Sequence, residues 1–403
     1  MGTSPIPRPS RAAPQRRPCR SKPASLTLFP TAARSGNGEP ESVGSAPPPA
    51  AGPSNKLATE LVGIARLAAF SPRAEAKRGI EYYLLPVRSI LNHCHSERVP
   101  FRWTANPYRG CEFGCRYCYA RYTHEYMDLD GAEFETKIYV KQDAGRLLER
   151  DLSCCKVWGE HIAIGTATDP YQPAEREFGA TRAILEKMAE REGLSLSITT
   201  KSDQVLRDID LLERISVRSS LAVNLSITTL RTRLARALEP RAPRPDLRLE
   251  TVRKLRAAGI AAGVFAMPIL PGLTDHKEDL DALARGAQDA GAQWFAANVL
   301  FLMPASLKQF LPFLEQKFPK LVQRYQSWYG HYGNAPETYR REIASRVEGL
   351  RRKYDLGSRP PKSATQTWRS TQLSLTWENG DAAHEQVGEK QTWLPQAGGG
   401  REF

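Results

Sequence analysis

The sequence predicts an α/β fold in which helices cover a parallel β-sheet, and three observations support this prediction. Short apolar segments alternate with amphipathic helical segments between roughly residues 75 and 355. Several of the helical segments end on a glycine, which is a common helix stop. The chain has 403 residues, of which 41% are hydrophobic, and this is enough to bury a sizeable core. Repeated alternation of strand and helix is typical of a parallel sheet.

The individual elements follow from the apolar pattern. Five apolar stretches are expected to be strands, at 161–167, 194–201, 220–229, 260–270 and 294–302. The expected helices lie between them at 180–193, 203–215, 247–259 and 276–291. A further strand near the first cysteines brings the total to about six βα units. Six units are compatible with an open doubly wound sheet or with a complete or partial barrel, and the periodicity leaves this choice open.

The two ends of the chain differ from this core. Residues 1–60 are rich in proline and lack apolar periodicity, so we expect a disordered arm. The first 38 residues contain no Asp or Glu, which also suits a transit peptide, although disorder is the favoured interpretation. Residues 356–403 are expected to be a disordered tail. The predicted organisation is therefore an arm, a core with a helical C-terminal extension over 75–355, and a tail.

Composition restricts the location and the partners. No stretch approaches the roughly 18 apolar residues of a membrane span, and no signal peptide follows the basic N-terminus, so we expect a cytoplasmic protein without membrane contact. Seven cysteines, a sparse and odd number, fit a reducing compartment. The net charge is +13, and residues 1–60 contribute eight Lys and Arg against three Glu. The remaining excess favours a nucleic-acid partner only weakly.

The most specific local feature is a C-x3-C-x2-C run formed by Cys111, Cys115 and Cys118. Thiolates are soft ligands that select iron–sulfur clusters, zinc or Cu(I). A zinc site would need a fourth ligand, for which His124 is the candidate. Three cysteines also suit a cubane cluster of four irons in which one iron has no protein ligand. The spacing favours the iron–sulfur site and leaves structural zinc as the alternative.

These residues carry a family resemblance. The cysteine run, with Tyr117 just before its last member, resembles the signature of the radical S-adenosylmethionine (SAM) superfamily. The segments NPYRGCEFGCRYCYARYTHEYM, GTATDPYQPAE, ITTKS, LEPRAPRPDLRLETV and PILPGLTD resemble its spore photoproduct lyase-related branch, also called DNA repair photolyase-like. The similarity covers roughly residues 80–355. It implies a partial (β/α)6 barrel of the TIM type.

The resemblance also implies cofactors and site residues. It implies that the three cysteines bind a 4Fe-4S cluster, which cleaves SAM to a 5′-deoxyadenosyl radical. The implied catalytic residues are Tyr117 and Tyr119, which flank the last cysteine. The implied SAM-binding residues lie at or near strand ends: Tyr119, Thr168, Asp169, Lys201 and Ser226. Arg109 and Arg121 are expected at the edge of the cluster, and residues 239–245 are expected to form a rigid loop with cationic rim residues.

The implied reaction is lyase-like chemistry on a nucleic acid, with DNA repair as the specific candidate. An electron donor such as a flavodoxin or a ferredoxin is the second implied partner. Two alternatives remain open at this point. One is radical modification of a protein or a small metabolite, and the other is a non-catalytic zinc-binding module that binds nucleic acid.

One position departs from the pattern of the lyase. Spore photoproduct lyases carry a hydrogen-donating cysteine where this chain has Thr166. A hydroxyl O–H bond is too strong to give up hydrogen readily to a carbon radical. Cys154 and Cys155 are possible substitutes, although a free cysteine is more often a small hydrophobic residue. The resemblance therefore predicts the radical generator and leaves the hydrogen donor unassigned.

Overall fold

The computed structural model describes residues 61–77, 79–96, 99–154, 157–330 and 333–360. Its larger sheet has the strand order β11-β10-β9-β8-β7-β4-β3. The strands are β3 (Leu91–His93), β4 (Trp103–Ala105), β7 (His161–Ile164), β8 (Ser195–Thr200), β9 (Ser220–Ser226), β10 (Ala262–Ile269) and β11 (Phe295–Val299). All neighbours from β4 to β11 pair in parallel, and β3 is antiparallel to β4. The six parallel strands form the predicted partial (β/α)6 barrel.

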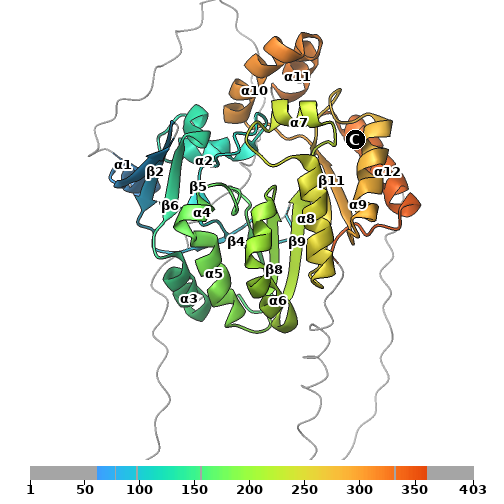
Figure 1. Ribbon diagram of the computed structural model, residues 1–403. Helices are drawn as coiled ribbons and strands as arrows, with labels where there is room; N and C mark the ends of the chain where they lie inside the picture. The colour runs from blue at the N-terminus through green and yellow to red at the C-terminus, as the bar shows by residue number, and fades with distance from the viewer. Residues whose placement is uncertain (1–60, 78, 97–98, 155–156, 331–332, 361–403) are drawn as a thin grey trace, which may run out of the picture.

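The helices between these strands cover the outer face of the barrel (Figure 1). They are α3 (Ala144–Cys154), α5 (Ala180–Ala189), α6 (Ile209–Arg218), α8 (Pro245–Ala257) and α9 (Lys277–Asp289). The predicted helix at 203–215 begins differently, because residues Asp203–Asp208 form a 3-10 helix. Ser202 caps this helix, since its hydroxyl accepts a hydrogen bond from the Gln204 amide at 3.2 Å. The predicted order of strands and helices is confirmed.

The barrel interior explains one glycine in the middle of a strand. Gly263 lies in β10, and a Cβ atom there would be only 2.3 Å from a ring carbon of Trp294. The Trp294 side chain is fully buried, and its indole nitrogen donates a hydrogen bond to Asn224 at 3.0 Å. The close approach of ring and backbone therefore requires glycine at position 263.

A second, smaller sheet was not predicted. It has the order β1-β2-β6-β5 and consists of β1 (Arg73–Lys77), β2 (Ile80–Leu85), β6 (Lys137–Lys141) and β5 (Tyr108–Arg109). The short helix α1 (Gly63–Ala69) lies beside it (Figure 1). β5 directly precedes the cysteine run and pairs with β6 in antiparallel fashion. The small sheet therefore holds the entry of the cysteine loop.

The C-terminal extension follows the last barrel strand and is helical within the described residues. It contains α10 (Pro304–Lys317), α11 (Val322–Tyr329) and α12 (Glu337–Lys353). Figure 1 shows α10 and α11 above the barrel and α12 beside α9. Leu356 is buried, and Gly357 pairs with Trp294, so the first residues of the expected tail pack on the barrel.

The predictions of a disordered arm and of a disordered tail concern segments that are mostly outside the described residues, namely 1–60 and 361–403. Within the described residues, no helix combines the length and the apolar character needed to cross a bilayer.

Candidate active site

The three cysteines lie on one loop between β5 and the short helix α2 (Tyr122–Glu125), near the carboxyl end of β4. Cys111 and Cys115 are each only 8% exposed. The Cys111 amide donates to the Phe134 carbonyl at 2.9 Å, and the Cys118 amide donates to the Cys115 carbonyl at 3.2 Å. At the other end, the Ser306 hydroxyl of α10 donates to the Cys118 carbonyl at 2.7 Å. The loop is thus fixed by backbone contacts on both sides.

Burial dominates the electrostatics of the thiols. It raises the pKa of all three cysteines, and Cys115 and Cys118 raise the pKa of Cys111 further. Cys111 and Cys115 are thus each within electrostatic range of Cys118. Lys201 lowers the pKa of Cys115, and Arg121 lowers that of Cys118, each in part. A metal centre that takes up the thiolates would release their protons and gain from these two cations.

The three cysteines supply the ligand number of a cubane cluster in which one iron has no protein ligand. Among the described residues, no group of three or more His, Cys, Asp or Glu side chains is placed to hold one metal ion. A cubane cluster binds each thiolate at a different iron, so its ligands need not converge on one point. His124 is fully buried, and its Nε2 lies 3.0 Å from the Lys137 carbonyl oxygen. Its Nδ1 has no hydrogen-bond partner among the described residues, but His124 forms no metal-holding group with the three cysteines, so the zinc module stays an alternative.

A buried network joins the cysteine loop to the far side of the barrel. The Tyr117 hydroxyl donates to the Glu239 carboxylate and lies 2.9 Å from the Thr228 hydroxyl, which follows β9. Glu239 also forms an ion pair with Arg248 of α8 at 2.5 Å, and both side chains are 1% exposed. Residues 239–245 were predicted as a loop with a cationic rim. Glu239, the first residue of this segment, has the opposite charge and faces the interior, where it neutralises Arg248.

Lys201 follows β8 and faces the same network. Its Nζ lies 3.9 Å from Glu239 Oε1, and its side chain is 15% exposed. The Asp169 carboxylate fixes the backbone here, because it accepts hydrogen bonds from the Lys201 amide at 2.7 Å and from the Thr200 hydroxyl at 2.6 Å. Asp169 therefore links the segments that follow β7 and β8, while the Lys201 ammonium faces Glu239 and lowers in part the pKa of Cys115 and Cys118.

Thr168 and Gln172 support the start of the cysteine loop. The Thr168 hydroxyl donates to the Gly110 carbonyl at 2.6 Å, and the Gln172 amide donates to the same carbonyl at 3.1 Å. Gln172 also accepts a hydrogen bond from the Glu112 amide at 3.0 Å. Sequence reasoning missed Gln172, although it lies within the matched segment GTATDPYQPAE. In this structure Thr168 binds the loop backbone, so its prediction as a SAM contact stays a prediction.

Tyr119 and Thr166 lie together at the carboxyl end of β7. The Tyr119 hydroxyl donates to the Thr166 carbonyl. Asn106, which follows β4, donates to the Thr166 hydroxyl at 3.0 Å and accepts from the Ala167 amide at 2.9 Å. Asn106 is a second residue that sequence reasoning missed, although it begins the NPYRG segment. Thr166 is thus within the site, beside the predicted catalytic tyrosine.

Of the remaining predicted residues, Ser226 lies at the edge of the barrel that carries the site, whereas Cys154 does not. Ser226 ends β9, and its carbonyl accepts a hydrogen bond from Arg248 at 2.9 Å, so it lies at the same edge as Lys201. Cys154 is exposed at the end of α3, which leads toward the amino end of β7. It is therefore at the opposite edge of the barrel and cannot take over the role of the missing lyase cysteine. Cys155 lies outside the described residues.

Two cations share a small polar pocket next to Asn106. Arg109 and Lys141 line it together with Asn92, Asn106, Tyr108, Thr123 and Ala167. Lys141 is 5% exposed, and burial together with the nearby Arg109 lowers its pKa to about 7. The Arg109 Nε has no hydrogen-bond partner among the described residues. The two cations thus border a cavity of about 20 Å³, which has room for about one water molecule, and Asp151 offsets part of the burial cost of Lys141.

We expect Lys141→Met to stabilise the protein by about 3–5 kcal/mol at pH 7. An unfolded lysine keeps its proton up to a pH near its ordinary value of 10.5, whereas folded Lys141 releases it near 7. The unfolded state therefore binds more protons between these values, and stability rises with pH across this window. Urea unfolding at several pH values, at matched iron content, should show that the variant loses this rise. An unchanged pH dependence would contradict the burial of a lysine without compensation.

Comparison with known proteins agrees with this geometry. Residues 105–284 match the family model of the radical SAM superfamily. An uncharacterized protein of Mycobacterium tuberculosis is 35% identical over 299 residues, which cover 74% of this chain and 86% of the relative. An uncharacterized protein of Methanocaldococcus jannaschii is 29% identical over 219 residues, covering 54% and 77%.

Solved structures of spore photoproduct lyase share the fold. A variant with bound AdoMet and dinucleoside spore photoproduct has a TM-score of 0.53 and 15% identity, covering 74% of this chain and 86% of that chain. The lyase complexed with dinucleoside spore photoproduct has a TM-score of 0.53 and 16% identity, covering 68% and 79%. At such identities the likeness concerns the fold.

The barrel and its cysteine loop define an enzyme of the radical type. The chain belongs to the radical SAM superfamily, whose members use a 4Fe-4S cluster and SAM.

Proposed function

We propose that this chain binds a 4Fe-4S cluster through Cys111, Cys115 and Cys118 and uses it to cleave SAM for radical chemistry on a nucleic acid. The observation that supports the proposal is the loop itself, which holds Cys111, Cys115 and Cys118 at the carboxyl edge of the barrel, where the Arg121 guanidinium donates to the Cys115 carbonyl at 3.1 Å. Catalytic groups of (β/α) barrels collect at this edge. A cluster bound there supplies the electron that splits SAM into methionine and a 5′-deoxyadenosyl radical.

The surrounding residues receive roles from their positions. Lys201 is proposed to pair with the carboxylate of SAM, and the 3.9 Å distance from its ammonium to Glu239, its one ion pair among the described residues, supports this role. Tyr117 locks the loop onto Glu239, and Tyr119 borders the substrate side through Thr166. Thr168, Asp169 and Ser226 define the polar edge against which SAM binds. A flavodoxin or a ferredoxin is the proposed electron donor.

A nucleic acid is the proposed substrate for two reasons. Arg109 and Lys141, which line a small pocket beside Asn106, would contribute positive charge near the site toward a nucleic-acid substrate. The solved spore photoproduct lyases with this fold bind a dinucleoside photoproduct, and a DNA lesion is accordingly the specific candidate here. Because Thr166 replaces the hydrogen-donating cysteine, a reaction identical to that of the lyase needs a donor from elsewhere.

The decisive experiment is anaerobic reconstitution with iron and sulfide, followed by reduction with dithionite in the presence of SAM. The wild-type protein should form 5′-deoxyadenosine, whereas Cys111→Ala, Cys115→Ala and Cys118→Ala should fall to the level of a mock reconstitution. Each substitution removes one ligand of the cluster, so iron content should fall as well.

Cys154→Ala provides the matched control, since it removes an exposed cysteine at the opposite edge of the barrel. It should retain both iron and product. A fully loaded wild-type protein that forms no 5′-deoxyadenosine would end the proposal, and so would triad variants that are as active as the control.

A further inference from the structure

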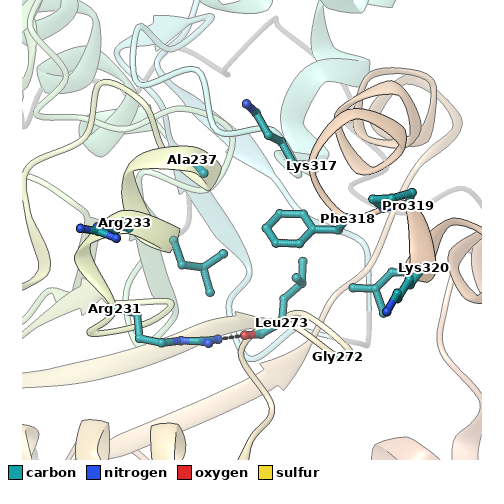
Figure 2. Close-up of a pocket in the computed structure, with 11 residues that line it drawn as sticks. Arg231, Arg233, Ala237, Gly272, Leu273, Lys317, Phe318, Pro319 and Lys320 are labelled. Carbon is teal, nitrogen blue, oxygen red and sulfur yellow. Dashed lines mark hydrogen bonds between the residues drawn. The ribbon is translucent and has the colours of Figure 1, made fainter.

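A second cavity lies outside the cysteine site, between α7 (Thr232–Leu238) and the end of α10. It encloses about 600 Å³, which is within the usual range of ligand sites. Figure 2 shows Phe318 and Leu273 at its centre, below Ala237. Leu234 and Leu321 complete an apolar floor. We call this cavity the α7–α10 groove.

The rim of the groove is cationic. Arg231, Arg233, Lys317 and Lys320 line it, and no carboxylate does (Figure 2). Arg231 is already engaged, because it pairs with Asp279 at 3.1 Å and donates to the Leu273 carbonyl. The other three are exposed and have no ion pair among the described residues. An apolar floor with free cations around it fits a ligand that presents flat apolar surfaces and repeated negative charges.

The groove is connected to the cysteine loop by α7. One side of this helix lines the groove, while the carbonyl of its last residue, Leu238, accepts a hydrogen bond from the Arg116 amide of the loop at 2.9 Å. Glu239, which pairs with Lys201, follows directly. Arg231 and Leu273 follow β9 and β10, so the groove opens at the same edge of the barrel as the site. If one unit of a polymer enters the barrel to react, the neighbouring units of that polymer lie close to the groove.

We infer that the α7–α10 groove binds single-stranded nucleic acid, with a base on Phe318 and phosphates on Arg233, Lys317 and Lys320. This inference rests on the proposed function and extends it by naming the strandedness and the surface. An unpaired base has a free face that can stack on an aromatic ring. Because every base has such a face, we expect binding in the groove to depend little on the nucleotide sequence. A duplex hides its base faces within the stack. A target base must also leave the stack to reach a barrel interior.

The test uses the full chain and a fluorescently labelled single-stranded oligonucleotide of mixed sequence, with anisotropy recorded over a range of salt concentrations. Affinity of the wild-type protein should fall linearly in a log–log plot, by about 0.7 per neutralised phosphate. Lys317→Glu combined with Lys320→Glu should weaken binding at least about tenfold and reduce this slope by about 1.4, since two phosphate contacts are lost.

Phe318→Leu keeps an apolar side chain on the floor but removes the ring. It should weaken binding about fivefold or more at every salt concentration and leave the slope unchanged, because stacking on a ring involves no counterion release. A double charge reversal on the outer helices, Arg214→Glu with Lys254→Glu, is the matched control. These residues of α6 and α8 are exposed and have no ion pair among the described residues, and this variant should bind like the wild type.

Two results would overturn the inference. One is equal binding by the wild type and the Lys317, Lys320 double variant, and the other is duplex binding as tight as single-strand binding. Formation of 5′-deoxyadenosine by the wild type without nucleic acid is measured in parallel. Its absence would count against the proposed function, whereas unaltered oligonucleotide binding in the groove variants would count against the groove alone.

Discussion

Glu239→Ala is expected to destabilise the protein by about 3–5 kcal/mol, because it leaves Arg248 charged and buried without a partner. Both side chains of this pair are 1% exposed, and the closest atoms are 2.5 Å apart. Tyr117 and Thr228 lose their acceptor in the same change. Urea unfolding of the wild type and the variant measures the effect. A loss below about 1 kcal/mol would show that water or a shifted Arg248 compensates for the missing carboxylate.

The ionisation of Glu239 gives this prediction a pH signature. Burial by itself raises its pKa, but Arg248 and Lys201 outweigh burial and lower the pKa to about 2. A carboxyl whose folded pKa is below its unfolded value of 4.5 stabilises the fold above that value. This stability is lost as the pH falls from about 4.5 to about 2. The Ala variant should lack this part of the acid transition.

Glu239→Gln separates charge from hydrogen bonding. The amide oxygen still accepts from Tyr117, so the loop should stay in place, while the negative charge next to Lys201 disappears. The reduction potential of a cluster depends on nearby charge. Because Arg248 and Lys201 then act without a compensating anion, reconstituted Glu239→Gln protein should have a higher reduction potential than the wild type. An unchanged potential in a folded, loaded variant would place Glu239 outside the electrostatic range of the cluster.

This network shows what the sequence reveals and what it does not. The strands and helices of the barrel were predictable because each has a strong apolar period, and the cysteine run was predictable because its spacing is local. Glu239 lies within a matched segment that was predicted to form a loop with cationic rim residues, and no role was predicted for this carboxylate. A carboxylate next to Pro and Arg residues in the sequence is usually solvated. Glu239 is buried because it forms an ion pair with Arg248 of α8, a contact that the local sequence does not reveal.

The small sheet was missed for a related reason. β5 has only two residues and β6 has five, and their pairing depends on contacts between distant segments. Asn106 and Gln172 likewise act through hydrogen bonds to backbone atoms about 60 residues away. Side chains of this kind leave no periodic signal. The local motif thus predicts which residues bear the chemistry, whereas the residues that hold them in place emerge only from the fold.

Among glycine-to-alanine substitutions in the cysteine loop, we expect Gly110→Ala to reduce the stability of the protein most. Gly110 directly precedes Cys111 and has a φ of +83°, which already disfavours any side chain. A Cβ atom there would lie 2.7 Å from the Lys137 carbonyl oxygen and 2.9 Å from the Phe134 carbonyl oxygen. Both are backbone atoms, one in β6 of the small sheet and one in the segment just before it, so they cannot rotate away from the added Cβ. We expect a loss of about 3–4 kcal/mol from strain and overpacking together.

The displacement should also reach the cluster site. The Phe134 carbonyl accepts the Cys111 amide, and the Gly110 carbonyl accepts Thr168 and Gln172, so moving Gly110 disturbs three hydrogen bonds that fix Cys111. Iron bound after reconstitution should therefore fall well below the wild-type value.

Gly114→Ala is the matched control, because Gly114 also has a positive φ, +60°, but its nearest Cβ neighbours are side-chain atoms at 3.6 Å or more. It shares the backbone strain and lacks the collision, so only Gly110→Ala should lose iron. Equal iron in the two variants would mean that the small sheet does not position the first cysteine.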